Sequence, residues 1–155
     1  MSVVRATIDI DAPPQQVWDV IMDPARFGDW VTIHRKLCRV DDGEPCRKGF
    51  RMDQRLVLRG APFTVHWTLT EVEEPKVGTF EGKGPAGSYA RVTNRLKDLD
   101  GGRTCFDYEN EFKAPGGVMG ALASRVLVGG MPEREADKSL KRLKRLIEKG
   151  SARAM

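Results

Sequence analysis

Hydrophobic and polar residues alternate along much of the chain, which is the pattern of strands with one buried and one exposed face. The first run covers residues 3–10, where Val4 and Ile8 alternate with Arg5 and Asp9. Further runs, separated by glycine, proline and aspartate turns, cover residues 34–41, 49–59, 62–73, 76–83, 87–99 and 102–113. Together the runs predict an antiparallel sheet of about seven strands.

Two short helices are predicted between the first two strands. In DAPPQQVWDVIMD and DPARFGDW, apolar residues recur at three- and four-residue spacing, and Phe27 and Trp30 share one face of the second helix. An aspartate precedes the prolines of each segment. We therefore expect Asp11 and Asp23 to be the N-caps of these helices.

The last third of the chain has a helical pattern, from about residue 118 to residue 149. Gly129, Gly130 and Pro132 interrupt this pattern and predict a kink or two segments. The apolar stripe near the end consists of Leu140, Leu143 and Ile147. Off this stripe lie the cations Lys138, Lys141, Arg142, Lys144 and Arg145.

The basic residues of this helix raise the question of an anionic partner. A helix that docks through its leucines and has a solvated basic back is the simplest interpretation. Anionic lipid or nucleic acid could use the same face. No aromatic residues are interleaved for base stacking, so no nucleic-acid partner is expected.

Composition indicates a cytoplasmic globular protein. The 155 residues fit a single domain, 1–155, with 40% hydrophobic and 31% charged residues and a net charge of +4. No apolar run approaches a transmembrane length, and the N-terminus lacks the pattern of a signal peptide. Cys38, Cys46 and Cys105 match no disulfide or zinc spacing, which favours a reducing compartment.

The order of strand, two helices, strands and terminal helix resembles the START-like, or polyketide cyclase-like, superfamily (SRPBCC). IDIDAPPQQVWDVIMDPARFGDW and SLKRLKRLIEKG carry most of this resemblance. It implies an α+β helix-grip fold, in which a curved sheet wraps the C-terminal helix. It also implies a cavity that binds lipids, sterols, polyketides or plant hormones. These segments are signatures of the fold rather than of a catalytic mechanism.

If one face of each strand looks into such a cavity, alternation identifies the side chains that would bind a ligand. They are Met52, Gln54, Leu56, Phe63, Val65, Trp67, Phe80, Val92, Asn94, Tyr108, Asn110 and Phe112. Hairpin geometry tests this set. Its predicted pairs are Arg59 with Pro62, Gln54 with Trp67, Leu56 with Val65, Leu99 with Arg103, Asn94 with Tyr108, and Val92 with Asn110.

Three amides, Gln54, Asn94 and Asn110, stand in this otherwise apolar set. They either orient a polar group of a ligand or bond to each other, to the helix backbone or to trapped water. Tyr108 with Asn94 and Asn110 is also the only plausible acid–base set. No catalytic residue is assigned, because GxSxG, HExxH and inward carboxylate pairs are absent.

No metal or cofactor is expected from the two histidines. Alternation places His66 on the exposed face, whereas His34 could reach the mouth of a cavity. The hairpin loops RGAP and GKGPAGS resemble the gate and latch of plant hormone receptors of this fold, so Gly60, Pro62, Gly84 and Gly87 are candidate entrance residues. Ordinary turn chemistry explains the same glycines and prolines.

WVTIHRK and GAPFTVHWTL also resemble segments of small bacterial START-like proteins, some of which are toxins of toxin–antitoxin pairs. Three hypotheses follow. The first is a protein that binds an apolar or aromatic small molecule, without catalysis. The second is a polyketide cyclase or aromatase that acts through pocket shape and polar groups. The third is a toxin-like module with a small protein partner.

Overall fold

The computed structural model describes residues 2–41, 47–58, 60–113 and 131–154. In these ranges the strands are β1 (Ser2–Ile10), β2 (His34–Val40), β3 (Arg51–Leu58), β4 (Ala61–Glu73), β5 (Val77–Lys83), β6 (Tyr89–Asp98) and β7 (Thr104–Lys113). They form one antiparallel sheet in the order β1-β7-β6-β5-β4-β3-β2. This confirms the predicted sheet.

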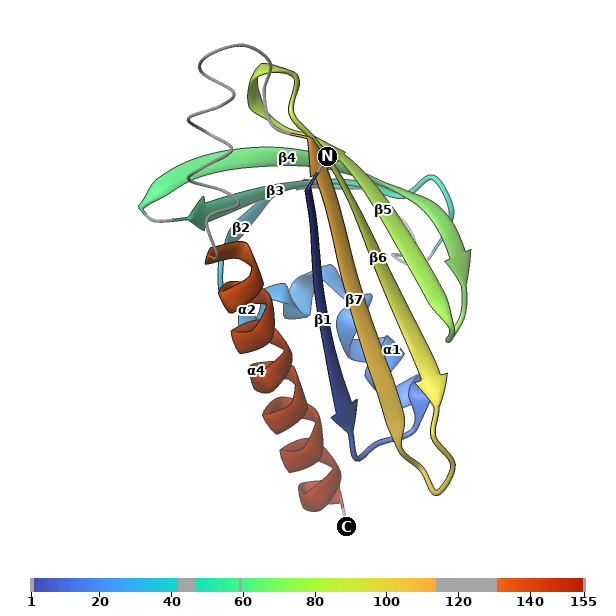
Figure 1. Ribbon diagram of the computed structural model, residues 1–155. Coiled ribbons are helices and arrows are strands. Elements are labelled where there is room, and N and C mark those ends of the chain that lie inside the picture. The colour runs from blue at the N-terminus through green and yellow to red at the C-terminus, as the bar shows by residue number, and fades with distance from the viewer. Residues whose placement is uncertain (1, 42–46, 59, 114–130, 155) are drawn as a thin grey trace.

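The helices are α1 (Pro14–Ile21), η1 (Pro24–Arg26), α2 (Phe27–Trp30), η2 (Pro85–Gly87) and α4 (Met131–Ala154). The sheet is strongly curved, α1 and α2 lie within its curve, and α4 runs beside β1 (Figure 1). The arrangement confirms the predicted helix-grip fold, with two short helical segments between the first and second strands.

Proline and aspartate begin the short helices in different ways. Asp23 caps η1, because its carboxylate accepts a hydrogen bond from the backbone N–H of Ala25 at 3.0 Å. The prediction that Asp11 caps α1 was wrong. Pro13 is the N-cap of α1, without a side-chain hydrogen bond. The backbone N–H of Asp11 donates instead to Glu148 of α4 at 3.0 Å, which ties the segment before α1 to α4.

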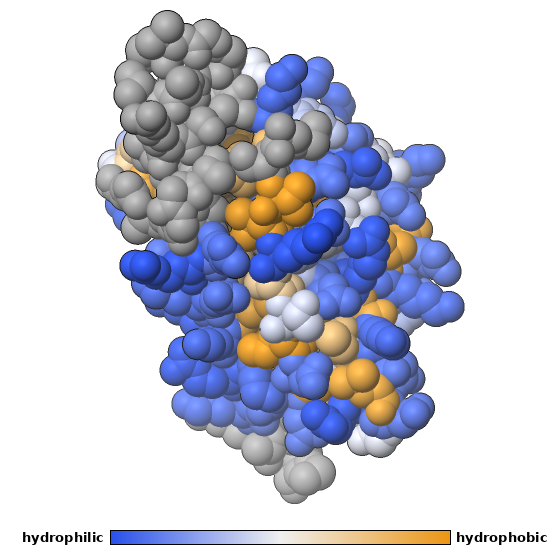
Figure 2. Space-filling model, viewed as in Figure 1, coloured by the Kyte–Doolittle hydropathy of each residue, from blue (hydrophilic) through white to orange (hydrophobic). Residues whose placement is uncertain are grey.

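The apolar stripe of α4 docks as predicted. Leu140, Leu143 and Ile147 are buried, and most of the cations off this stripe are exposed. Figure 2 shows the side of the molecule where α4 lies as mainly hydrophilic. Lys144 is the exception among these cations, since its ammonium donates to the carbonyl of Asp9 on β1 at 2.9 Å.

The predicted kink in this helix can be followed only in part. Gly129 and Gly130 lie outside the described residues, as does the first part of the predicted helix, residues 118–130. Pro132 lies in the first turn of α4, where its missing N–H removes no intrahelical bond. From Met131 to Ala154 the segment is a single helix.

Hairpin register was predicted correctly for β6–β7. Asn94 lies opposite Tyr108, and Val92 lies opposite Asn110. The N–H of Leu99 donates to the carbonyl of Arg103 at 3.0 Å, which closes the predicted three-residue loop. In this loop Asp100, Gly101 and Gly102 all have positive φ.

The register predicted for β3–β4 was wrong by two residues. The observed pairs are Gln54 with Val65, Leu56 with Phe63 and Val57 with Pro62, in place of Gln54 with Trp67, Leu56 with Val65 and Arg59 with Pro62. The chain turns one residue earlier than predicted, with Gly60 at φ +78°. A shift of two residues leaves every side chain on its predicted face.

Candidate ligand cavity

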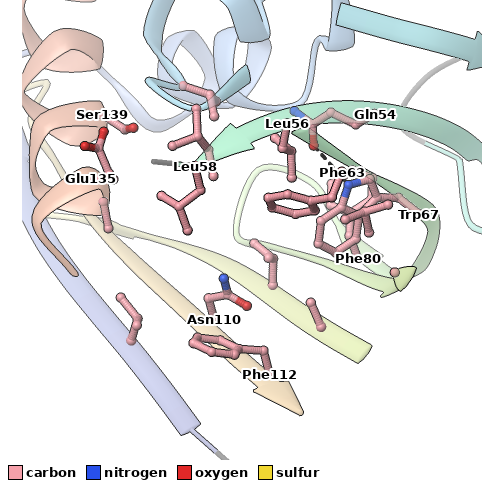
Figure 3. A pocket seen from close by; sticks show the side chains of 18 of the residues that line it. Gln54, Leu56, Leu58, Phe63, Trp67, Phe80, Asn110, Phe112, Glu135 and Ser139 are labelled. Atoms are coloured by element: carbon pink, nitrogen blue, oxygen red, sulfur yellow. Dashed lines mark hydrogen bonds between the residues drawn. The ribbon is translucent and has the colours of Figure 1, made fainter. Parts of the chain in front are cut away.

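A cavity of about 460 Å³ lies between the inner face of the sheet, the segment from α1 to β2, and α4. Every side chain that alternation predicts to bind a ligand lies on its wall. Figure 3 shows this wall with side chains from β3, β4, β5, β7 and α4. The part of these residues in binding remains a prediction.

Most of the wall is apolar. Leu56 and Leu58 of β3 share this wall with the aromatic side chains of β4 and β5, and Leu56 lies beside its cross-strand neighbour Phe63 (Figure 3). The rings of Trp67 and Phe80 pack edge to face, with centroids 6.4 Å apart. Gly82 makes room for the indole, since a Cβ there would lie only 2.6 Å from Cε3 of Trp67. The strand VGTFEGK therefore places one aromatic residue between two glycines on its inner face.

Polar side chains interrupt the sheet wall on β6 and β7. Asn94 is 5% exposed, and the side-chain oxygens of Asn94 and Asn110 are both buried without a hydrogen-bond donor among the described residues. Tyr108 lies opposite Asn94. Burial raises the pKa of Tyr108 to about 12, although the Asn110 amide acts in the opposite direction. Tyr108 is therefore a neutral phenol at physiological pH.

Gln54 differs from the two asparagines because protein groups satisfy its amide. Its Oε1 accepts a hydrogen bond from Nε1–H of Trp67 at 3.0 Å, and its Nε2 lies 2.9 Å from Nδ1 of His34. An indole N–H can only donate, so the Gln54 oxygen faces Trp67 and the NH₂ group faces His34. Nδ1 of His34 must then accept. Burial lowers the pKa of His34, which favours this neutral form.

A third polar group, on the helix side of the cavity, was not predicted. Thr32, Glu135 and Ser139 all line the wall. The hydroxyl of Thr32 donates to Oε2 of Glu135 at 2.5 Å, and its backbone N–H donates to Oγ of Ser139 at 3.0 Å. Helical spacing offered a signal, because residues 135 and 139 precede Leu143 at intervals of four on the apolar stripe.

The predicted entrance residues do not all reach the cavity. Pro62 and Gly84 lie on its wall, whereas Gly60 and Gly87 are exposed residues with positive φ that take no part in the wall. Turn geometry accounts for both of these glycines. Gating by the β3–β4 and β5–β6 loops remains a prediction.

Other candidate chemistry lies away from the cavity. His66 is on the outer face, as predicted, and its Nδ1 lies 2.7 Å from the carboxylate of Asp53. Among the residues that the structure describes, no three His, Cys, Asp or Glu side chains are grouped to hold a metal ion. In the same part of the chain, no helix is long and apolar enough to cross a membrane.

The curved sheet, the terminal helix and the apolar cavity define a START-like protein of the helix-grip class. The chain belongs to the family described as polyketide cyclase / dehydrase and lipid transport, whose model matches residues 1–148. The family and the structural similarity together support a fold that binds hydrophobic ligands.

Several solved structures share this fold, and two of them serve as examples. One is the protein TTHA0849 from Thermus thermophilus, with a TM-score of 0.78, 20% sequence identity and coverage of 97% of this chain and 99% of that one. The other is the Zhui aromatase/cyclase from Streptomyces sp. R1128, with a TM-score of 0.74, 19% identity and coverage of 95% and 93%. A curated relative, Toxin Rv0910 of Mycobacterium tuberculosis, is 26% identical over 102 residues, which are 66% of this chain and 70% of the relative.

Proposed function

We propose that the protein binds an apolar or aromatic small molecule, similar to a lipid, sterol or polyketide, in the central cavity. The observation that supports this proposal best is the pair of buried amide oxygens, on Asn94 and Asn110, that no described residue satisfies. An unsatisfied buried polar group costs about 1–3 kcal/mol. A ligand with a matching polar group would recover part of this cost. Without a ligand, water in the cavity would do the same until a ligand displaces it.

The size and lining of the cavity agree with such a ligand. A volume of about 460 Å³ lies within the usual range of small-molecule sites. Such sites combine apolar walls with a few polar groups that fix orientation. Here the aromatic side chains of β4 and β5 supply the apolar surface, and the amides of β6 and β7 supply the polar groups.

The test begins with native mass spectrometry of the protein purified from its own host. We expect a copurified small molecule that organic solvent extracts. Asn110→Leu should then leave stability unchanged or raised, while affinity for that molecule falls by about 1–3 kcal/mol. Glu111→Gln, on the opposite face of β7, is the matched control. Loss of stability without loss of affinity would show that Asn110 only braces the fold.

A cyclase or aromatase activity is the second candidate. Tyr108 favours it, because a phenol with a pKa of about 12 stays protonated and can donate to a substrate carbonyl that the amides of Asn94 and Asn110 orient. A soluble poly-β-ketone mimic should then cyclise faster with the protein than without it. Tyr108→Phe should abolish this acceleration, and equal rates with and without protein would exclude it.

A toxin-like role is supported by the similarity to Toxin Rv0910 alone. This hypothesis predicts growth arrest on expression and rescue by a small protein partner. Harmless overexpression in the native host, with its neighbouring genes deleted, would count against it.

A further inference from the structure

The polar cluster on the helix side of the cavity, formed by Thr32, Glu135 and Ser139, places a carboxylate in the wall. Glu135 comes from the second turn of α4, and its side chain is 17% exposed. Figure 3 shows Glu135 and Ser139 on α4, across the cavity from Trp67 and Phe80. The carboxylate therefore lies at the opposite end of the cavity from the aromatic cluster.

The contacts of Glu135 leave room for another hydrogen-bond donor. Oε2 accepts from the Thr32 hydroxyl at 2.5 Å. Oε1 lies 3.7 Å from Nζ of Lys138, whose side chain is 60% exposed. An ion pair this long with a solvated lysine is weak. A carboxylate offers about four lone-pair sites, so Oε1 can accept from a ligand.

The other ionisable groups among the described wall residues do not neutralise the negative charge of Glu135 inside the cavity. Tyr108 and Tyr89 both have raised pKa values, Tyr108 through burial and Tyr89 mainly through its hydrogen bond to Glu81, so both stay neutral. Among the described residues of the wall, Lys113 is the one cation. It is exposed at the end of β7, where water solvates its ammonium.

We propose that Glu135 determines the chemical class of the ligand, an inference that rests on the proposed binding function. The ligand has an apolar body against the aromatic cluster and a hydrogen-bond donor, a hydroxyl or protonated amine, against Glu135. A molecule that ends in a carboxylate, such as a fatty acid, is rejected, because its charge would repel that of Glu135 within a mostly apolar wall. Thr32 positions the carboxylate through its hydroxyl.

Three probes with one ring system test this inference: 2-naphthol, 2-naphthylmethylamine and 2-naphthoate, measured by calorimetry at neutral pH. We expect the wild-type protein to bind the amine and the naphthol at least about tenfold tighter than the carboxylate, since a hydrogen bond to a charged group is worth about that factor or more. This ranking needs no variant, so it does not depend on how a mutant folds.

Glu135→Gln removes the charge and keeps an acceptor for Thr32. We expect the variant to bind naphthoate more tightly and the amine less tightly, so that the ranking collapses. Glu133→Gln, at an exposed position of the same helix, should leave the ranking unchanged. Thermal melting of both variants checks that each is folded.

The outcomes separate the two proposals. Equal affinity of the wild-type protein for all three probes, or tighter binding of naphthoate, overturns the role of Glu135 and leaves the binding function intact. Failure of every probe to bind, with no copurified molecule in native mass spectrometry, overturns the binding function and this inference with it.

Discussion

Replacing Gln54 with leucine should destabilise the protein, because it removes the amide that joins His34 to Trp67. Both partners lose a hydrogen bond at 2.9–3.0 Å. Trp67 is 8% exposed, so an unpaired indole N–H there costs about 1–3 kcal/mol. His34 is only half-buried, and water can replace its partner. We therefore expect a net loss of about 1–3 kcal/mol.

Gln54→Glu tests the contact between this side chain and His34. The carboxylate still accepts from Trp67, but its second oxygen faces Nδ1 of His34 and requires a proton there. In the wild-type protein the pKa of His34 lies below 6.5, so the folded state binds fewer protons than the unfolded state. Stability is then lost as the pH falls below 6.5 and through the lowered pKa. In Gln54→Glu the pKa should rise above 6.5, and stability should be lost as the pH rises through it.

The assay is urea denaturation at several pH values, combined with an NMR titration of the two histidines. An unchanged denaturation midpoint for Gln54→Leu would show that the amide contributes nothing to the fold. The same pH dependence in Gln54→Glu as in the wild type would show that residue 54 does not contact Nδ1 of His34.

Three further variants test the packing and the acid stability of the fold. Gly82→Ala should lower the free energy of unfolding by about 1–3 kcal/mol, because the new Cβ would lie 2.6 Å from Trp67 Cε3. Urea denaturation that shows no loss of stability would mean that the indole can move aside. Leu143→Ala should cost about 2–5 kcal/mol, since Leu143 is fully buried against the sheet, whereas the exposed Lys141→Ala should change stability little. Burial alone would raise the pKa of Glu148, but hydrogen bonds from Lys144 and the N–H of Asp11 outweigh it and lower the pKa below 4.5. Glu148 thus contributes stability above pH 4.5 that is lost as the pH falls through its lowered pKa. Glu148→Gln should therefore make the loss of stability at acid pH less steep. A thermal melting series from pH 6 to pH 3 that is equally steep for both proteins would contradict the assignment.

The faces of the sheet could be predicted from the sequence, but one register could not. Alternation has a period of two, so it places Gln54 and Trp67 on the inner face in either of two registers that differ by two residues. Turn chemistry had to decide between these registers. The three-residue loop with Gly101 and Gly102 has one favourable geometry, whereas RGAP allows the turn to begin at either of two positions.

The helix side of the cavity was missed for a different reason. Glu135 and Ser139 lie on the same stripe as Leu143, and a stripe of this kind indicates only that a helix packs against something. Thr32 follows α2 in a segment without regular periodicity. Its position beside α4 depends on contacts between residues more than a hundred positions apart, which no local pattern contains.

Alternation predicted Gln54, Asn94 and Asn110 as one set, and the structure divides them by what surrounds each amide. Protein groups bond to both ends of the Gln54 amide, so its polarity serves the fold. Asn94 and Asn110 have buried oxygens without a partner among the described residues, so their polarity costs stability unless something else in the cavity binds them. Substitution by leucine should therefore act in opposite directions: Gln54→Leu lowers stability, whereas Asn110→Leu leaves it unchanged or raises it. A polar residue in an apolar wall is thus a candidate for ligand binding only where the protein leaves one of its donor or acceptor atoms open to a ligand.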